Sequence, residues 1–181
     1  MPKGDDDIDW DHHWESVENN VTYYDDVKVF DYFIKYIPQF DFKICELGCG
    51  PARWAPVWGK IYGKYYGIDS SPKAIERATK KFPNNKFICN PAWHLYEFNE
   101  AFDVVFTNTF LQHVKNENKD LIVRNVRNCL RPYGLFITQE KSDVDSKTTM
   151  VAPKWIKFVS DRGFECVTYQ ENKGFVFRRL S

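Results

Sequence analysis

Two glycines and an aspartate have the spacing of a nucleotide-binding turn. Gly48 and Gly50 directly follow an apolar run that begins at Phe42, and Asp69 ends the next apolar run, about 20 residues after Gly48. Glycines at the end of a buried strand permit a tight turn and let a ligand approach the backbone closely. A carboxylate at the end of the following strand can accept hydrogen bonds from both hydroxyls of a ribose. The sequence therefore predicts a site for an adenosine-bearing ligand.

Position 53 distinguishes between two kinds of adenosine ligand. The dinucleotide fingerprint G-x-G-x-x-G/A requires a small residue there, so that a pyrophosphate can sit at the N-terminus of the next helix. This chain has Arg53 instead, which disfavours a nicotinamide dinucleotide. The remaining pattern, Glu46-x-Gly48-x-Gly50-x-Ala52 followed by Asp69, resembles the cofactor motif of class I S-adenosylmethionine-dependent methyltransferases.

The resemblance continues beyond this motif. The stretch from Ala101 to Asn108 is similar to the fourth strand of the family, and the stretch from Leu130 to Ile137 is similar to its turn into the fifth strand. Together the similar stretches cover roughly residues 40 to 140, most of one domain. The resemblance implies S-adenosyl-L-methionine as the cofactor and S-adenosyl-L-homocysteine as its product.

By this resemblance, the expected cofactor-binding residues follow the ends of the first four strands. Cys49 is expected to contribute its backbone, and Arg53 either faces the methionine carboxylate or points into solvent. The family commonly has Asp in the adenine loop, where this chain has Asn90, whose amide oxygen can accept the same hydrogen bond. Trp93 either stacks on adenine or packs against the core. The full expected set is Glu46, Gly48, Cys49, Gly50, Arg53, Asp69, Ser70, Asn90, Pro91, Ala92, Trp93 and Asn108.

The segment after the fourth strand contains the predicted catalytic residue. Family members that methylate amino groups of nucleic acids usually have Asp or Asn followed by two prolines and an aromatic residue here, whereas this chain has Asn108-Thr109-Phe110. Small-molecule methyltransferases of the family often have a histidine a few residues later, and His113 matches. A histidine can take up a proton near neutral pH, so His113 is the expected general base. An ordinary surface-loop histidine is the equal alternative.

Alternating strands and helices are expected to position these residues. Short apolar runs predict the strands, and helical periodicity with cap residues predicts the helices between them. The clearest helix start is Ser71-Pro72, a cap followed by a proline, and a short helix is expected from Arg53 to Lys60, its free N–H groups beside the cofactor. The turn residues 171–174 predict a terminal hairpin. As in the family, we expect an α/β, Rossmann-like fold with a seven-stranded, mostly parallel sheet, helices on both faces and a C-terminal antiparallel hairpin.

The chain is expected to form a single methyltransferase domain over residues 25–181, preceded by an acidic and aromatic segment over residues 1–24. The aromatic side chains of that segment either form a lid over the site or pack on the core. They are Trp10, Trp14, Tyr23 and Tyr24. The acidic run beside His12 and His13 is read as a solvated tail in preference to a metal site, and no metal is expected.

Composition limits the partners. Lys plus Arg and Asp plus Glu are both 25, so no net charge attracts nucleic acid or an anionic membrane. The sequence has no apolar run near the ~18 residues of a membrane span, and a cytoplasmic location is expected. The five cysteines form no C-x-x-C pair and are read as buried small side chains. The oligomeric state stays open.

The predicted function is transfer of a methyl group from S-adenosylmethionine to an O or N atom of a small molecule. Two alternatives remain at this stage, a methyltransferase that acts on protein or RNA and a non-catalytic module that binds the cofactor. A nicotinamide-dependent oxidoreductase is less favoured, because Arg53 and the terminal hairpin both argue against it.

Overall fold

The computed structural model describes residues 8–16, 31–37, 41–59, 64–95 and 98–181. In chain order its elements are α1 (Trp10–Ser16), β1 (Lys43–Leu47), α3 (Ala55–Gly59), β2 (Lys64–Asp69), α4 (Pro72–Lys81), β3 (Lys86–Cys89), β4 (Phe102–Asn108), the 3-10 turn η1 (Leu111–His113), α5 (Asn116–Cys129), β5 (Leu130–Gln139), α6 (Ala152–Ser160), β6 (Phe164–Gln170) and β7 (Gly174–Arg179).

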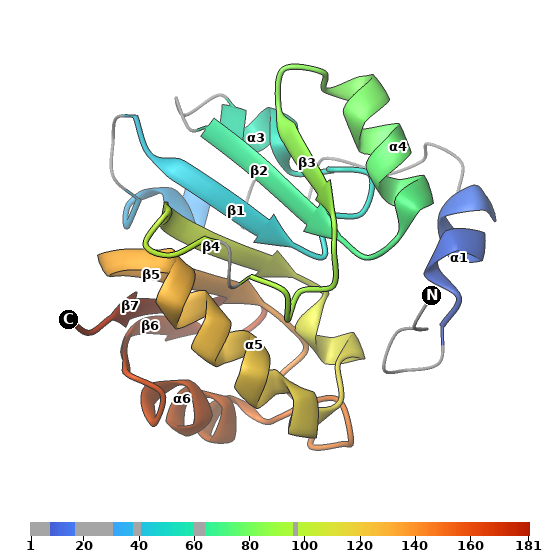
Figure 1. Ribbon diagram of the computed structural model, residues 1–181. Coiled ribbons are helices and arrows are strands. Elements are labelled where there is room, and N and C mark those ends of the chain that lie inside the picture. Colours follow the sequence, from blue (N-terminus) through green and yellow to red (C-terminus); the bar gives the residue numbers. More distant parts are fainter. Residues whose placement is uncertain (1–7, 17–30, 38–40, 60–63, 96–97) are drawn as a thin grey trace.

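One sheet contains the seven strands in the order β3-β2-β1-β4-β5-β7-β6 (Figure 1). The first five strands pair in parallel, and the terminal β6–β7 hairpin pairs antiparallel, with β7 beside β5. The chain leaves β1 toward β2 and later returns to β4 on the other side of β1. Open α/β sheets bind ligands at such a reversal, at the carboxyl ends of the strands. The predicted fold class is confirmed.

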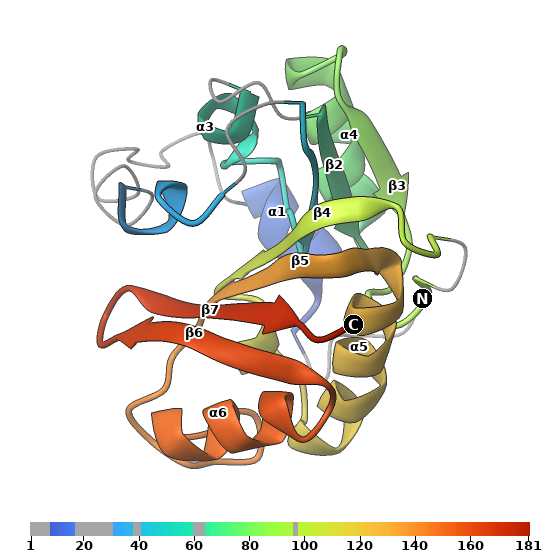
Figure 2. The ribbon, with the colours of Figure 1, turned by 90° about the vertical axis from the view of Figure 1, so that its left-hand side faces the viewer.

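Helices cover both faces of the sheet because the strands are apolar on both sides. On one face, Trp58 of α3 and Ala78 of α4 pack in a buried cluster with Phe106. On the other face, Ile122 of α5 and Trp155 of α6 pack in a second cluster. Figure 2 shows α3 and the α5–α6 pair on opposite sides of the strands.

Local signals set where the helices begin. Ser71 caps α4, since its Oγ accepts the backbone N–H of Ala74 at 3.1 Å, and Pro72 is the first helical residue, as predicted. Helix α3 has Pro56 in its first turn, where a missing N–H costs little. It begins at Ala55, later than the predicted start at Arg53.

The cysteine prediction is wrong for two residues. Cys45, Cys49 and Cys129 are buried, whereas Cys166 is only partly buried and Cys89 is exposed. Cys89 ends β3, the edge strand of the sheet, and an edge strand is covered from fewer sides than a central one.

Helix α1 packs against the N-terminal end of α4. Ser71 Oγ donates to Asp11 Oδ1 at 2.5 Å, and Lys73 Nζ lies 3.4 Å from Glu15 Oε1. The predicted aromatic residues Tyr23 and Tyr24, like the acidic residues 5–7, lie outside the described residues. Within the described parts of the chain, no helix is long and apolar enough to cross a membrane.

Candidate active site

A cavity of about 350 Å³ lies at the carboxyl ends of β1, β2 and β4, beside α1. Its volume falls within the range of about 300–1,000 Å³ that small-molecule sites occupy. The predicted base His113 and all the predicted cofactor-binding residues except Asn90 line it. Residues distant in sequence therefore share one space at the reversal of the strand order.

The glycine loop forms one wall of the cavity. Gly48 and Gly50 have φ angles of +68° and +51°, in the left-handed region that favours glycine. The backbone N–H groups of Gly48 and Cys49 both donate to Ile68 O, at 2.8 and 3.1 Å. The Cys49 side chain points into the protein, since a Cβ added at Gly67 would lie 2.8 Å from its sulfur. Burial also raises the pKa of the Cys49 thiol well above its usual value, so the loop offers its backbone and not a thiolate.

Asp69 connects the glycine loop to the start of α4. Its Oδ2 accepts the Gly50 N–H at 2.8 Å, and its Oδ1 accepts the Ser71 N–H at 2.9 Å. Burial raises the pKa of Asp69, while these two N–H donors act in the opposite direction. A carboxylate oxygen can accept more than one hydrogen bond, so Asp69 retains acceptor capacity for a ligand in the cavity. Ser70, which lies between Asp69 and Ser71 in the sequence, is exposed and also lines the cavity.

Glu46 forms part of the cavity floor and is only 2% exposed. Its Oε2 accepts the Tyr65 hydroxyl at 2.6 Å. Burial, followed by the nearby Glu46 carboxylate, raises the pKa of Tyr65 well above its usual value. Tyr65 therefore stays a protonated donor and fixes the Glu46 side chain.

Arg53 and Asn108, which both line the cavity, are hydrogen-bonded to each other. The Arg53 guanidinium donates to Asn108 Oδ1, and the Asn108 amide donates to Gln139 Oε1. Arg53 also lies over the Trp54 ring, with 5.9 Å between Cζ and the ring centroid. These two contacts hold the Arg53 side chain in place, with its positive charge at the cavity wall.

The expected role of the α3 N-terminus is not supported. The first amide of α3, Ala55 N–H, donates to Ala52 O at 3.2 Å, and Val57 N–H donates to Trp54 O at 3.0 Å. Both donors are bonded to carbonyl groups directly before α3, a helix of five residues. Arg53 is the better partner for an anionic group at this wall.

The loop after β3 provides another wall of the cavity. Pro91, Ala92 and Trp93 line the cavity, whereas Asn90 does not. The Asn90 N–H donates to Asp69 O at 2.9 Å, which holds Asn90 beside the end of β2. Trp93 is held in place by Asn125, whose amide donates to Trp93 O at 2.7 Å.

The turn after β4 brings Phe110 and His113 to the cavity. Thr109 has a φ angle of +50°, which is strained for a β-branched residue. The Phe110 ring packs so tightly on Gly48 that a Cβ on that glycine would overlap it. His113 lies in η1, and its ring makes an edge contact with Trp10, with 5.1 Å between the centroids.

Helix α1 closes the cavity with an aromatic group. Trp10 and Trp14 are stacked with their centroids 6.4 Å apart, and His13 contacts both rings at 5.4 and 4.8 Å. All three line the cavity. Aromatic rings at this opening exclude water while their polar ring atoms can still bond a ligand.

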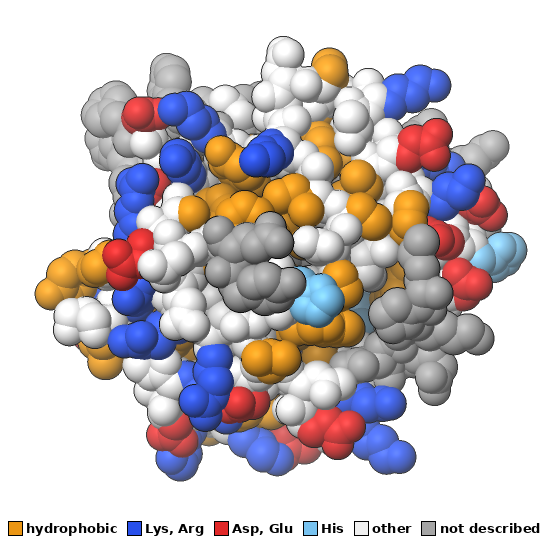
Figure 3. All heavy atoms as spheres, viewed as in Figure 1, with side chains coloured by type: hydrophobic (Ala, Val, Ile, Leu, Met, Phe, Trp, Pro, Cys, Tyr) orange, Lys and Arg blue, Asp and Glu red, His pale blue; other side chains and the backbone are white. Residues whose placement is uncertain are grey.

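Charged side chains are mixed on the face that Figure 3 shows. Hydrophobic side chains gather near its centre, and Lys, Arg, Asp and Glu alternate around its margin. In the part of the chain that the structure describes, no group of three His, Cys, Asp or Glu side chains has the arrangement of a metal site.

Sequence reasoning did not assign Thr109 and Phe110 to the cavity. The only sequence signal is their place directly after Asn108 at a strand end. The strained φ and the contact with Gly48 are tertiary features that no local pattern encodes.

The fold and the site define a class I, Rossmann-like methyltransferase domain. Residues 45–138 match the protein family described as a methyltransferase domain. Because this match spans more than half of the chain, the chain belongs to that family, whose cofactor is S-adenosylmethionine.

Known proteins agree with this assignment. A probable thiol methyltransferase of Arabidopsis thaliana is 27% identical over 70% of this chain, and the matching region spans 60% of the plant protein's length. The PH0226 protein of Pyrococcus horikoshii has a similar fold, with a TM-score of 0.79 at 14% identity, covering 94% of this chain and 99% of that one. An S-adenosylmethionine-dependent methyltransferase of Methanosarcina mazei is similar with a TM-score of 0.69 at 16% identity, covering 82% and 97%.

Proposed function

We propose that this protein transfers a methyl group from S-adenosylmethionine to an O or N atom of a small, largely apolar molecule. One observation carries the proposal: the glycine loop and Asp69 share a cavity with the aromatic side chains of α1 and with His113. A cofactor site and an acceptor site in one enclosed space are what direct transfer between two bound molecules requires.

The residues present fit the cofactor. Gly48 and Gly50 line the cavity in left-handed backbone conformations, and the missing Cβ atoms leave room for the rings of Phe110 and Trp14. Asp69 would bond the ribose hydroxyls, and Arg53 would face the methionine carboxylate. Pro91, Ala92 and Trp93 would line the adenine, with Ser70 at its edge, and Glu46 would face the methionine amino group.

His113 and the aromatic wall would supply the protein's part of the chemistry. Bound S-adenosylmethionine supplies an electrophilic methyl group on a positively charged sulfur. His113 would take the proton from a hydroxyl or ammonium acceptor, since its ring lies at the cavity wall. Trp10 and Trp14 would exclude water and orient the acceptor.

Helix α1 would act as a lid within the segment 1–24. Its contacts with the rest of the described chain are polar at Ser71 and Lys73 and aromatic at the cavity. Such contacts can open without exposing the core, so acceptor and product could pass beneath α1.

The acceptor would be small because the cavity is small and apolar side chains dominate the α1 side. The lining residues not assigned to the cofactor include Ile8, Trp10, His13, Trp14, His113 and Val114. A thiol acceptor is the second candidate, favoured by the similarity to a probable thiol methyltransferase. A thiol likewise reacts as its anion, so His113 would serve the same purpose.

Calorimetric titration with S-adenosylmethionine, S-adenosylhomocysteine and NADH tests the cofactor. Binding of both adenosyl ligands but not NADH supports the proposal, and binding of NADH alone refutes it. Methyl transfer is then measured on small phenols, amines and thiols, with bulk protein and RNA as competing acceptors. Transfer only to protein or RNA would favour that alternative, and tight cofactor binding without transfer to any acceptor would favour a non-catalytic binding module.

A further inference from the structure

Glu140 bonds the turn that lines the main cavity but does not itself line that cavity. It directly follows β5, and its carboxylate holds two backbone donors of the turn after β4: Phe110 N–H at 3.3 Å on Oε1 and Gln112 N–H at 3.1 Å on Oε2. Each carboxylate oxygen therefore holds a different residue of the same turn. Glu140 lines a separate, much smaller cavity of about 10 Å³ with Gln112 and Lys119.

The turn that Glu140 holds contains a strained residue. Thr109, directly before Phe110, has φ = +50°, a conformation that costs a β-branched residue free energy. Such conformations persist only where the surrounding contacts determine them. Thr109 N–H also donates to Gln139 O at 2.9 Å, so Gln139 and Glu140 together hold the backbone of this turn at Thr109, Phe110 and Gln112.

The same turn presents two side chains to the cavity. Phe110 packs on Gly48 of the glycine loop, and His113 meets Trp10 of α1. A displacement of the turn would therefore move a cofactor contact and the proposed base together.

A side-chain link extends from Glu140 to His113. Lys141 N–H donates to Gln112 Oε1 at 3.1 Å, and Gln112 Nε2 lies 3.5 Å from His113 Nε2. Gln112 is thus bonded to Glu140 through its backbone N–H and to Lys141 through its side-chain oxygen. The imidazole is positioned by a residue that Glu140 fixes.

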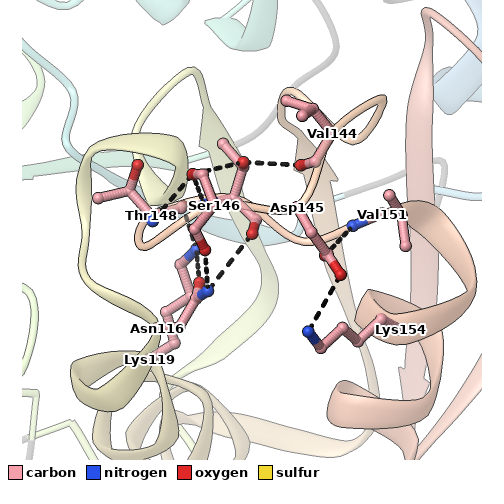
Figure 4. A network of polar contacts seen from close by, with 9 residues as sticks. Asn116, Lys119, Val144, Asp145, Ser146, Thr148, Val151 and Lys154 are labelled. Atoms are coloured by element: carbon pink, nitrogen blue, oxygen red, sulfur yellow. Dashed lines mark hydrogen bonds and ion pairs between the residues drawn. The ribbon is translucent and has the colours of Figure 1, made fainter.

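Hydrogen bonds join Lys119 and Asn116 of α5 to the loop after β5 (Figure 4). Lys119 of α5 is 3% exposed, and its Nζ donates to Asn116 Oδ1 at 2.9 Å and to Thr148 O at 2.5 Å. Asn116 also donates to Ser146 O at 2.8 Å. Burial lowers the pKa of Lys119 to about 8, and the negative charge of Glu140 opposes this shift.

We propose that Glu140 is a positioning residue for the methyl transfer, whose ionised carboxylate holds the turn from Thr109 to His113 in the geometry that receives the cofactor and the acceptor. This inference rests on the proposed function. Glu140 itself does not reach the main cavity, so its effect passes through Phe110, Gln112 and His113.

The proton state of Glu140 then controls the turn. Removal from water raises the pKa of Glu140 to about 7, against the backbone donors that favour the charged form. Protonation turns one oxygen from an acceptor into a donor, so one backbone N–H loses its partner. The charged groups that line the same small cavity as Glu140 are Lys119 from α5 and Lys141 from the following loop, and the Glu140 charge acts on Lys119. The turn is therefore held fully only above about pH 7.

The test compares the Glu140→Gln variant with wild type in calorimetric titrations with S-adenosylhomocysteine, on both sides of about pH 7. Wild-type affinity should rise as the pH increases through that value. In Glu140→Gln it should be about tenfold weaker at the higher pH and show no such rise, because one acceptor is lost permanently. Glu117→Gln, the same chemical change at an exposed position of α5, is the matched control and should behave as wild type.

Two further variants separate the effect from His113 and from general damage. In the His113→Ala variant, the affinity for S-adenosylhomocysteine should still rise through about pH 7. This rise should disappear when Glu140→Gln is added. Thr109→Gly relieves the strain at φ = +50° and should recover part of the affinity lost in Glu140→Gln. A merely structural Glu140 would produce neither the pH signature nor this rescue.

If Glu140→Gln does not fold, hydrogen exchange in the wild type takes its place. The Phe110 and Gln112 amides should be better protected above than below about pH 7, after correction for intrinsic exchange rates. Equal protection, or a folded Glu140→Gln with wild-type affinity and pH dependence, would overturn the positioning role alone. A wild type that binds no S-adenosylhomocysteine would overturn the proposed function as well.

Discussion

The indole of Trp14 lies so close to Gly50 that a Cβ on the glycine would be 2.7 Å from Trp14 Cζ2. Gly50 therefore has two constraints, its φ angle of +51° and the ring above it. The contact of Trp14 with Gly50 joins α1 to the glycine loop, in which Gly50 N–H donates to Asp69. Helix α1 and the glycine loop are thus fitted to each other at one residue.

Replacing Gly50 by Ala should weaken S-adenosylhomocysteine binding by at least about tenfold, because the left-handed backbone and the ring both oppose a Cβ. Trp14→Ala removes only the second constraint, so the double variant should bind better than Gly50→Ala alone. Gly59→Ala is the matched control, since a Cβ there meets nothing within 4 Å. Additive effects in the calorimetric cycle would show that the two residues do not interact.

Asp69→Asn should lower cofactor affinity by about tenfold or more, because the amide replaces one carboxylate acceptor by a donor. Burial raises the pKa of Asp69, so its contribution to stability is present at low pH and is lost as the pH rises through the raised pKa. Asp143→Asn on the exposed loop is the control, and unchanged affinity in Asp69→Asn would remove Asp69 from the site.

The sequence was sufficient for the sheet and for the cofactor side of the cavity, because these depend on short-range patterns. Ser71-Pro72 determines a helix start locally, and the position of Asp69 follows from the length of one βα unit. The role of Glu140 had no such pattern, since its carboxylate bonds a turn about 30 residues away in sequence. Cys89 was misplaced because an apolar strand pattern does not tell an edge strand from a central one.

His113→Ala should spare cofactor binding and lower turnover by about 100-fold on acceptors that must lose a proton. Acceptors that are already ionised at the assay pH should be nearly unaffected, because they need no base. A series of phenols or thiols of graded acidity measures this directly. The same loss for acidic and weakly acidic acceptors would mean that His113 positions the acceptor and does not take its proton.

Tyr65→Phe should lower the free energy of unfolding by about 2 kcal/mol and the melting temperature by about 5 °C, because it removes a donor from a buried carboxylate. The affected bond is the 2.6 Å contact with Glu46 Oε2. Tyr66→Phe, in the adjacent position on the opposite face of β2, is the control. Thermal unfolding with equal losses in both variants would exclude a special role for the Glu46 bond.

Glu140 should also change how the stability of the fold depends on pH. Its pKa is raised from 4.5 to about 7 in the folded protein, so its stabilising contribution is complete below the unfolded value and is lost as the pH rises through about 7. Between pH 4.5 and about 7, the free energy of unfolding falls by at most about 3 kcal/mol through this ionisation. Glu140→Gln cannot ionise and should lack this part of the pH dependence.

Urea unfolding at about pH 5 and about pH 8 measures this difference. The free energy of unfolding of wild type relative to Glu140→Gln should fall as the pH rises, whereas Glu117→Gln should stay parallel to wild type. Parallel curves for Glu140→Gln would mean that Glu140 is ionised across the whole range. If the curves diverge as expected, ionisation of Glu140 destabilises the fold. A residue that is retained for its positioning role can carry such a cost in stability.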